Sequence, residues 1–302
     1  MTSGSEESRR PAVRAGGPFA GRVAIVTGGA SGIGAALVRA LAARGTTVVI
    51  ADVDEAGAKA VADEIGGTSS AAALDVRDAG AVADLVTGVV AGEHGRLDLM
   101  FNNAGIAVGG TVDEMTLDHW DRVIDVNLRG VVHGIHAAYP VMLRQGDGHI
   151  VNTASLAGLV PGPGLAPYAA AKHAVVGISL SLRAEAANRG VRVSAICPGF
   201  VNTPLLGRVN PDLPQTQTGA NAAALARTLG KLYEADALAQ DVLRGITRNQ
   251  ALIVAPGSAR FAWRMARYAP GLTMRTIITG IRRRAGAADA GAGAERSGDD
   301  AG

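Results

Sequence analysis

The chain has 302 residues, a formal net charge of +2 at pH 7 and a single cysteine, Cys197. The small charge provides no general attraction to nucleic acid, and one cysteine excludes an internal disulfide. No apolar run reaches the roughly 20 residues of a membrane-spanning helix, and no Cys/His cluster has the spacing of metal ligands. We therefore expect a globular cytoplasmic protein with no nucleic-acid partner and no metal, whose length suffices for one large core.

The two ends of the chain differ in composition from its centre. Residues 1–17 are rich in Ser, Glu, Arg and Gly and lack the apolar core of a signal peptide, which predicts a disordered leader. Residues 285–302 are rich in Ala, Gly, Asp and Glu and predict a disordered tail. The rest divides into one folded domain over residues 18–257 and an amphipathic helical extension over residues 258–284.

A glycine-rich segment follows the first apolar run of the chain. Val23–Val26 predicts a strand, residues 27–34 read TGGASGIG, and residues 35–43 are rich in helix formers. Glycines in such a loop permit a tight turn and close approach of the backbone to a pyrophosphate, and the following helix N-terminus attracts the phosphate charge. A glycine-rich turn that binds no ligand is the alternative interpretation. The glycines of this loop at the spacing G-x-x-x-G-x-G are Gly28, Gly32 and Gly34, and Ser31 adds a hydroxyl donor.

An acidic residue closes the second expected strand. Residues 46–51 read TTVVIA, and Asp52 follows them, eighteen residues after Gly34. A carboxylate at this place can accept hydrogen bonds from the ribose hydroxyls of a dinucleotide and would repel a 2′-phosphate. No Arg or Lys lies inside the glycine loop or directly after Asp52. The pattern favours NAD over NADP, and an ordinary turn residue is the alternative.

Apolar and helical segments alternate along the rest of the chain. Such alternation predicts an α/β fold, a doubly wound parallel sheet with helices on both faces (a Rossmann fold), in a single domain. Ligands of these sheets bind outside the carboxyl ends of the strands. The further expected strands are Thr47–Ile50, Ala71–Leu74, Leu97–Asn102, His149–Thr153, Val191–Ile196 and Leu252–Val254, and the expected helices include Asp54–Ile65, Ala79–Gly92, Leu117–Arg144 and Tyr168–Ala187.

Tyr168 and Lys172 lie four residues apart, and Ser155 lies thirteen residues before the tyrosine. Four residues are just over one helical turn, so the phenol and the ammonium project from the same face. An ammonium near a phenol lowers the tyrosine pKa, and a tyrosine tuned in this way can transfer a proton to or from a reacting oxygen. Ser155 can donate a second hydrogen bond to that oxygen. The alternative is an exposed pair on a helix surface.

Taken in order, these segments resemble the short-chain dehydrogenase/reductase family in its single-domain branch, over residues 19–257. The resemblance implies that Tyr168 is the catalytic acid/base, that Lys172 lowers its pKa and holds the nicotinamide ribose, and that Ser155 orients the substrate oxygen. It also implies that Asn127 supports a water relay to the lysine. The matching segments are residues 27–34, Asp75-Val76, residues 102–105 (NNAG), Asn127, Ser155, Tyr168, Lys172 and Pro198-Gly199.

The expected cofactor-binding residues combine the glycine loop with the positions that the resemblance implies. Asp75 and Val76 resemble adenine contacts, and the segment from Pro198 to Thr203 resembles the one that holds the nicotinamide carboxamide. The full set is Gly28, Ser31, Gly32, Ile33, Gly34, Asp52, Val53, Asp75, Val76, Asn103, Ala104, Gly105, Tyr168, Lys172, Pro198, Gly199, Val201 and Thr203.

The segment from Pro204 to Gly230 is expected to form a mobile lid that excludes water from the reaction, with a helix over residues 222–229. Other pocket candidates are Leu156, Gly158, Leu159 and residues 162–165. None of these other candidates is charged. This favours an uncharged or lipophilic secondary alcohol or ketone over a small charged acid or a phosphorylated sugar.

Residues 258–284 predict two short amphipathic helices separated at Pro270-Gly271. Phe261, Met265 and Tyr268 share one face of the first, and a further apolar repeat runs through Met274 and Ile281. We expect this extension to pack on its own subunit or a partner subunit. The alternatives are a peripheral contact with an anionic membrane and a wall of an apolar pocket.

The resemblance implies an NAD-dependent oxidoreductase that transfers a hydride between nicotinamide and an uncharged or lipophilic secondary alcohol or ketone. Three alternatives stay open: an NADPH-dependent ketoreductase of acyl-chain ketones, a non-catalytic dinucleotide-sensing protein, and a scaffold at a membrane surface. Family habit implies a homodimer or homotetramer.

Overall fold

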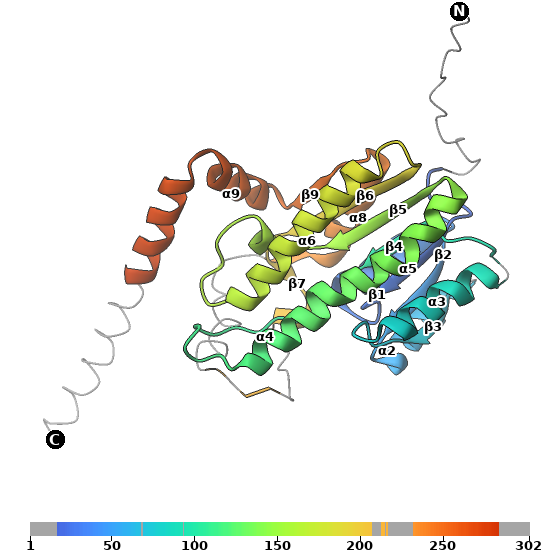
Figure 1. The fold of residues 1–302 in the computed structure, drawn as a ribbon, viewed down its shortest axis with the longest axis horizontal. Helices are drawn as coiled ribbons and strands as arrows, with labels where there is room; N and C mark the ends of the chain where they lie inside the picture. Colours follow the sequence, from blue (N-terminus) through green and yellow to red (C-terminus); the bar gives the residue numbers. More distant parts are fainter. Residues whose placement is uncertain are drawn as a thin grey trace, which may run out of the picture.

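The computed structural model describes residues 17–67, 69–92, 94–206, 213–214, 216 and 232–283. Seven parallel strands form one sheet in the order β3-β2-β1-β4-β5-β6-β9 (Figure 1). This is the doubly wound sheet predicted from the sequence. Its strands are β1 (Val23–Thr27), β2 (Thr47–Asp52), β3 (Ser70–Ala73), β4 (Leu99–Asn102), β5 (Gly148–Thr153), β6 (Val191–Pro198) and β9 (Leu252–Ala255).

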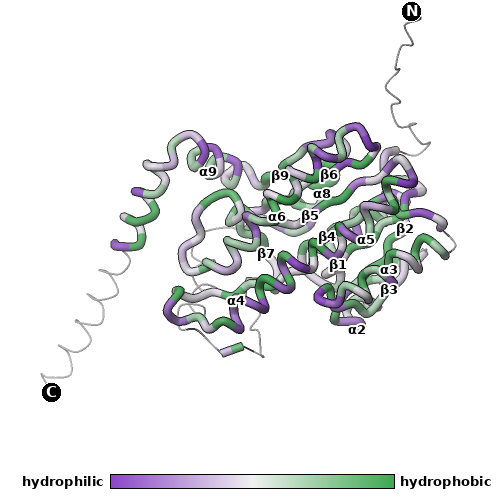
Figure 2. The backbone as a smooth tube through the Cα atoms, viewed as in Figure 1, coloured by the Kyte–Doolittle hydropathy of each residue, from purple (hydrophilic) through white to green (hydrophobic). Residues whose placement is uncertain are grey.

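Helices cover both faces of this sheet, which explains why its central strands are almost uniformly apolar. Successive side chains of β1 point to opposite faces: Ala24 and Val26 pack in one buried cluster and Ile25 packs in the other. Figure 2 shows hydrophobic residues along these strands. One face carries α1 (Gly32–Ala42), α2 (Glu55–Ile65) and α8 (Ala235–Thr247), and the other carries α3 (Ala79–Ala91), α5 (Gly130–Gln145) and α6 (Ala166–Glu185).

The strand order changes direction between β1 and β4. The chain passes from β1 outward to β2 and β3, and then returns to place β4 on the other side of β1. Loops after the carboxyl ends of β1 and β4 therefore lead away to opposite sides and leave a crevice between them. This crevice is where a ligand of the sheet is expected.

The long helix predicted over Leu117–Arg144 is interrupted. The structure has α4 (Leu117–Ile124), then a π-helical turn at Asp125–Arg129, then α5. A π-helical turn inserts an extra residue and turns the side chains within it to a new direction. Here the buried side chain of Asn127 bonds both backbone groups of Ile106, with donor–acceptor distances of 2.8 Å. The periodicity of the sequence did not reveal this interruption.

A network of charged side chains lies at the amino ends of the strands. Asp98, fully buried before β4, accepts hydrogen bonds from the β1 backbone at Val23 (2.9 Å) and from Arg22 and Arg96. Asp147, before β5, pairs with Arg22 at 3.3 Å and with Arg192 at 2.7 Å. A buried carboxylate is tolerated when it is paired and hydrogen-bonded, so this network joins four segments at the end of the sheet opposite the crevice.

Helix α9 (Gly257–Tyr268) follows the last strand, and a further helix covers residues 270–283. Figure 1 shows this further helix, in red, standing away from the body of the molecule. Among the described residues, no helix has both the length and the hydropathy needed to cross a membrane. The predicted leader up to residue 16, the tail over residues 285–302 and the helix over residues 222–229 lie outside the described residues.

Candidate active site

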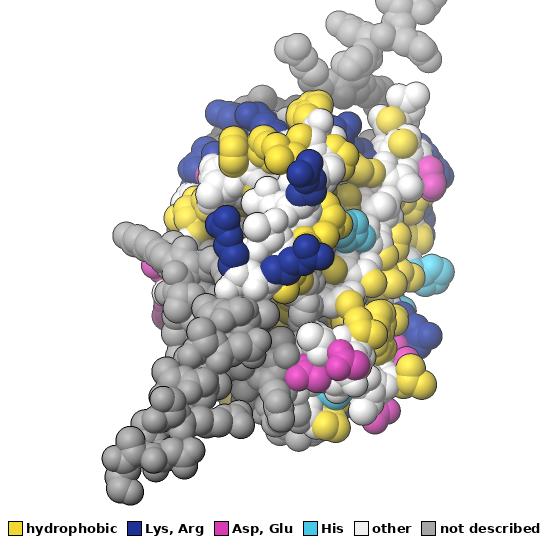
Figure 3. Space-filling view, turned by 90° about the vertical axis from the view of Figure 1, so that its left-hand side faces the viewer, with side chains coloured by type: hydrophobic (Ala, Val, Ile, Leu, Met, Phe, Trp, Pro, Cys, Tyr) yellow, Lys and Arg dark blue, Asp and Glu magenta, His cyan; other side chains and the backbone are white. Residues whose placement is uncertain are grey.

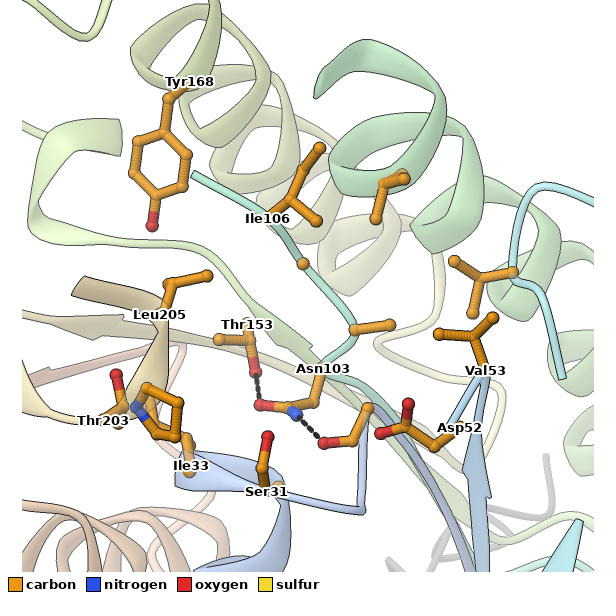
Figure 4. A pocket seen from close by; sticks show the side chains of 18 of the residues that line it. Ser31, Ile33, Asp52, Val53, Asn103, Ile106, Thr153, Tyr168, Thr203 and Leu205 are labelled. Atoms are coloured by element: carbon orange, nitrogen blue, oxygen red, sulfur yellow. Dashed lines mark hydrogen bonds between the residues drawn. The ribbon is translucent and has the colours of Figure 1, made fainter. Parts of the chain in front are cut away.

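A cleft opens outside the carboxyl ends of the strands, where the strand order reverses. Figure 4 shows it from close by, with Tyr168 and Leu205 toward one end and Asp52 and Val53 toward the other. Sixteen of the predicted site residues line it: Gly28, Ser31, Gly32, Ile33, Gly34, Asp52, Val53, Asp75, Val76, Asn103, Ala104, Gly105, Tyr168, Lys172, Pro198 and Thr203.

The glycine loop folds tightly against the first turn of α1. Gly28 has φ +66°, a conformation that L side chains rarely adopt. A Cβ at Gly34 would lie 1.9 Å from the carbonyl oxygen of Gly28, closer than any side chain allows. The first N–H groups of a helix have no partner within it, so this closely folded loop and helix start suit a pyrophosphate.

Hydrogen bonds fasten the glycine loop to the neighbouring strand ends. The Thr27 hydroxyl accepts from the backbone N–H groups of Asn103 (2.9 Å) and Ala104 (3.1 Å). The Asn103 amide donates to the carbonyl oxygens of Thr27 (3.0 Å) and Gly28 (3.2 Å), and its oxygen accepts from the Thr153 hydroxyl at 3.1 Å (Figure 4). These hydrogen bonds therefore fix the glycine loop to the ends of β1, β4 and β5.

Asp52 is held at the far end of the cleft by two backbone donors. Its Oδ2 accepts from the N–H of Ala30 and its Oδ1 from the N–H of Asp54, both at 3.0 Å. The first contact ties the carboxylate to the glycine loop, where a ribose next to the pyrophosphate would lie. Close by, Asp75 and Arg77 form an ion pair, and the hydrogen bond from Arg77 lowers the pKa of Asp75.

Tyr168 and Lys172 project from α6 as their spacing predicts. The Lys172 Nζ donates to the carbonyl oxygen of Thr153 at 2.7 Å and lies 5.6 Å from the centroid of the Tyr168 ring. The Ser155 Oγ accepts from the Ala157 N–H at 3.1 Å, and the Ser155 side chain also hydrogen-bonds Tyr168. The three predicted catalytic groups therefore meet beside the carboxyl end of β5.

Gly105 joins Asn127 to this group. A Cβ at Gly105 would lie 3.0 Å from Asn127 Oδ1 and 3.6 Å from Lys172 Nζ. The absence of a side chain lets the asparagine and the lysine face one another across the backbone. Lys172 lines the cleft and Asn127 does not. We therefore expect Asn127 to influence the reaction through Lys172 and not through direct contact with a ligand.

Burial shifts the pKa of Tyr168 in the direction opposite to the one expected from the sequence. Burial raises the pKa of Tyr168, and the hydrogen bond with Ser155 only partly offsets this. Lys172 is not among the causes of this shift in the Tyr168 pKa, so a lowering of that pKa by Lys172 stays a prediction. The ammonium is directed at the Thr153 carbonyl oxygen rather than at the phenol oxygen, and burial lowers the pKa of Lys172 itself to about 8.

This buried lysine predicts a pH-dependent stability. The pKa of Lys172 falls from 10.5 to about 8 on folding, so between these values the unfolded chain binds more protons than the folded one. Stability from this group therefore rises with pH through that window, by at most about 3 kcal/mol. Urea unfolding without cofactor measures the free energy of unfolding of the wild type and of Lys172→Met. The wild-type value is expected to rise relative to that of the variant as the pH rises. A stability difference that stays flat with pH would contradict the assignment.

Several predicted residues lie elsewhere. Gly199 and Val201 do not line the cleft: the former lies against Ala259, and the latter is buried in the core. Leu156 and Leu159 pack in a core cluster, and Gly158 lies directly on the backbone of α6. None of these three residues lines the cleft formed by the described residues. The Cys197 thiol is buried as predicted, and burial raises its pKa to about 12.

The apolar wall of the cleft comes from other residues. Ile106, Leu205 and Leu213 lie at the Tyr168 end. Ile106 directly follows the predicted segment 102–105, and Leu205 and Leu213 lie within the segment Pro204–Gly230 that was predicted to form the lid. The other lining residues that were not in the predicted set are Leu74, Arg77, Arg122, Val126, Thr153, Ala154 and Pro204. Within the described ranges, no group of three His, Cys, Asp or Glu side chains is placed to hold a metal ion.

Comparison with known proteins agrees with this geometry. Residues 22–214 match the family model of the short chain dehydrogenases. The chain is 41% identical over 203 residues to a 2,5-dichloro-2,5-cyclohexadiene-1,4-diol dehydrogenase of Sphingobium indicum, which covers 66% of this chain and 81% of the relative. It is 41% identical over 207 residues to a 3-alpha-(or 20-beta)-hydroxysteroid dehydrogenase of Mycobacterium bovis, covering 68% and 79%.

A solved structure shows the same fold with a bound dinucleotide. It is a short chain dehydrogenase/reductase from Burkholderia phymatum in complex with NAD, with a TM-score of 0.78 and 32% sequence identity. The match covers 84% of this chain and 95% of that one. The chain therefore belongs to the short-chain dehydrogenase/reductase family and is an NAD(P)-dependent oxidoreductase that acts on CH–OH groups.

Proposed function

We propose that this enzyme uses NAD to oxidise a secondary hydroxyl group carried on an uncharged, largely apolar ring, in a reversible reaction. The observation that carries the proposal is the contrast between the two ends of the cleft. Asp52 lies at one end, and Tyr168 lies at the other beside Ile106, Leu205 and Leu213. The relatives of the chain include a dehydrogenase named for a cyclohexadiene diol and one named for hydroxysteroids, both of which are compounds with apolar rings.

The cofactor supplies the hydride chemistry when bound, since nicotinamide C4 accepts or donates the hydride. The glycine loop and the N-terminus of α1 would hold its pyrophosphate, and Asp52 its adenosine ribose. In oxidation, the deprotonated Tyr168 takes the proton of the substrate hydroxyl, and Ser155 donates a hydrogen bond to the same oxygen. In reduction, Tyr168 returns a proton to the oxygen. Lys172 would pass that proton on toward solvent through a relay of water molecules, which Asn127 would support.

Asp52 supports NAD over NADP because its carboxylate would lie where a 2′-phosphate binds. Two cations line the same cleft, Arg77 and Arg122, and the guanidinium of Arg77 is paired with Asp75 at 2.5 Å. A phosphate brought beside the Asp52 carboxylate would be repelled by it. The NADPH-dependent ketoreductase suggested by the sequence is therefore the less supported alternative.

Asp52→Asn is expected to lower the ratio of kcat/KM for NAD over NADP by about ten- to hundredfold, because the amide neither accepts as strongly nor repels phosphate. Steady-state kinetics with both cofactors measures the ratio. Asp54→Asn is the matched control, since Asp54 caps α2 by accepting from the Gly57 N–H at 2.9 Å and does not line the cleft. An unchanged ratio in Asp52→Asn would reject the role of Asp52.

The proposed reaction is tested by offering the enzyme a panel of cyclic and open-chain secondary alcohols, charged hydroxy acids and sugar phosphates. Formation of reduced cofactor is followed by its absorbance, with NAD and with NADP. Preferred turnover of neutral cyclic alcohols with NAD supports the proposal. Preference for the charged substrates would refute the substrate class, and no turnover with any compound would favour a dinucleotide sensor. A homodimer or homotetramer and a cytoplasmic location stay predictions from the sequence.

A further inference from the structure

The two last described helices, α9 and the helix over residues 270–283, are here called the C-terminal helix pair. Its base is fixed to the body: Ala259 is buried, Trp263 packs against the same core cluster, and Arg260 Nη1 donates to the Val254 carbonyl oxygen at 3.0 Å. Beyond this base the pair leaves the sheet, and its second helix stands away from the other elements (Figure 1). The pair therefore presents surfaces that the fold does not cover.

Large apolar side chains occupy these uncovered surfaces. On α9, Phe261 and Tyr268 lie seven residues apart and therefore form a stripe on one face of the helix. Their side chains are 67% and 80% exposed. On the second helix, Met274, Ile278 and Ile281 share one face and are 44%, 40% and 47% exposed. Single exposed apolar residues are ordinary, but repeated ones on two adjoining helices mark an interaction surface.

The charge of the helix pair is entirely of one sign. Residues 257–283 contain six arginines and no Asp, Glu or Lys. Arg264 and Arg267 are exposed beside the stripe of α9, and Arg275 and Arg282 are exposed beside the stripe of the second helix. Figure 3 looks onto this side of the molecule, where basic side chains lie among hydrophobic ones. The partner must therefore accept apolar groups and offer negative charge.

We infer that the C-terminal helix pair binds the surface of an anionic lipid bilayer. Apolar stripes bordered by arginines are the pattern of helices that lie in the membrane interface, with the apolar side chains in the acyl boundary and the guanidinium groups at the phosphates. A second copy of the chain fits less well, since the same face on two copies would bring arginines together without an acidic group between them. The inference rests on the helix pair alone and does not depend on the proposed substrate or cofactor.

The test is flotation of the full chain with two kinds of vesicle: phosphatidylcholine alone, and equal parts of phosphatidylcholine and phosphatidylserine. Binding is expected to the anionic vesicles and to weaken with added salt. Arg275→Gln and Arg282→Gln are each expected to reduce the partition coefficient about fivefold. Ile278→Ser and Ile281→Ser are each expected to reduce it about tenfold. These four side chains are exposed, so the variants should keep the dehydrogenase activity and the fold.

Matched controls replace exposed residues of the same type elsewhere on the chain, with Leu117→Ser on α4 and Arg248→Gln after α8. Both are expected to bind the anionic vesicles as the wild type does. The inference is overturned if the intact protein binds neither vesicle, or if the controls lose binding as much as the helix-pair variants. It is also overturned if Ile278→Ser lowers the oligomer mass in light scattering while leaving flotation unchanged, since a second copy would then cover this face.

Discussion

Tyr168→Phe is expected to lower kcat by a factor of about 10² to 10⁴ while NAD still binds with wild-type affinity. Phenylalanine keeps the half-buried ring and loses only the hydroxyl that faces the cleft and bonds Ser155. The ring packs in an apolar cluster with Ala171 and Leu213, which the substitution leaves intact. Steady-state kinetics gives kcat, and quenching of tryptophan fluorescence gives the dissociation constant of NAD.

Two further measurements separate this role from a structural one. In the wild type, the oxidation rate should rise with pH, because burial raises the pKa of Tyr168 and the deprotonated form is the base. The variant should lose this dependence. Tyr139→Phe on α5 is the matched control, since the Tyr139 hydroxyl accepts from Arg189 at 3.5 Å and Tyr139 does not line the cleft, and this variant should keep full activity. A Tyr168→Phe enzyme with kcat within a few-fold of wild type would end the acid/base assignment.

Gly34→Ala is expected to weaken NAD binding about a hundredfold and to destabilise the fold by about 1–3 kcal/mol. Helix propensity alone predicts the opposite, since alanine inside a helix is favoured over glycine by about 1 kcal/mol. The steric clash outweighs the gain in helix propensity, because the new Cβ would lie 1.9 Å from the Gly28 carbonyl oxygen and 2.7 Å from Asn103 Nδ2. The loop must then open and break its bonds to Asn103.

Gly88→Ala separates the effect of helix propensity from the effect of the steric clash. Gly88 is exposed within α3, and a Cβ there would meet no atom within 4 Å. The Gly88→Ala variant should therefore be more stable than the wild type by up to about 1 kcal/mol and should bind NAD with unchanged affinity. Urea unfolding and NAD titration of both variants provide the measurements. If Gly34→Ala were as stable as Gly88→Ala and bound NAD normally, the tightly closed loop described here would be incorrect.

The sheet and most of the cleft could be predicted from the sequence because local patterns decide them. Strands buried on both faces appear as continuous apolar runs, and the residues that end them, such as Asp52 and Asn103, fall at one edge of a parallel sheet. The spacing of Tyr168 and Lys172 likewise required only helical geometry. Even so, the edge strand β3 is Ser70–Ala73 rather than Ala71–Leu74, since its short apolar pattern is weak.

The features that could not be predicted depend on contacts between distant segments. The π-helical turn at Asn127 exists where the asparagine reaches the backbone of Ile106, which no helical periodicity reveals. The direction of the Tyr168 pKa shift depends on burial and on where the Lys172 ammonium points. The cleft is lined by Leu213 and not by Leu156, because chain packing rather than nearness to Ser155 in sequence decides which leucine faces the cleft.

The charged network of Arg22, Asp98 and Asp147 anchors the strands at their starting ends, whereas every group proposed to touch cofactor or substrate lies where the strands finish. The ion pairs that join the strands and the groups proposed for the chemistry therefore lie a full strand length apart. Substitutions in the charged network are expected to change the free energy of unfolding and to leave the positions of the proposed catalytic groups unchanged.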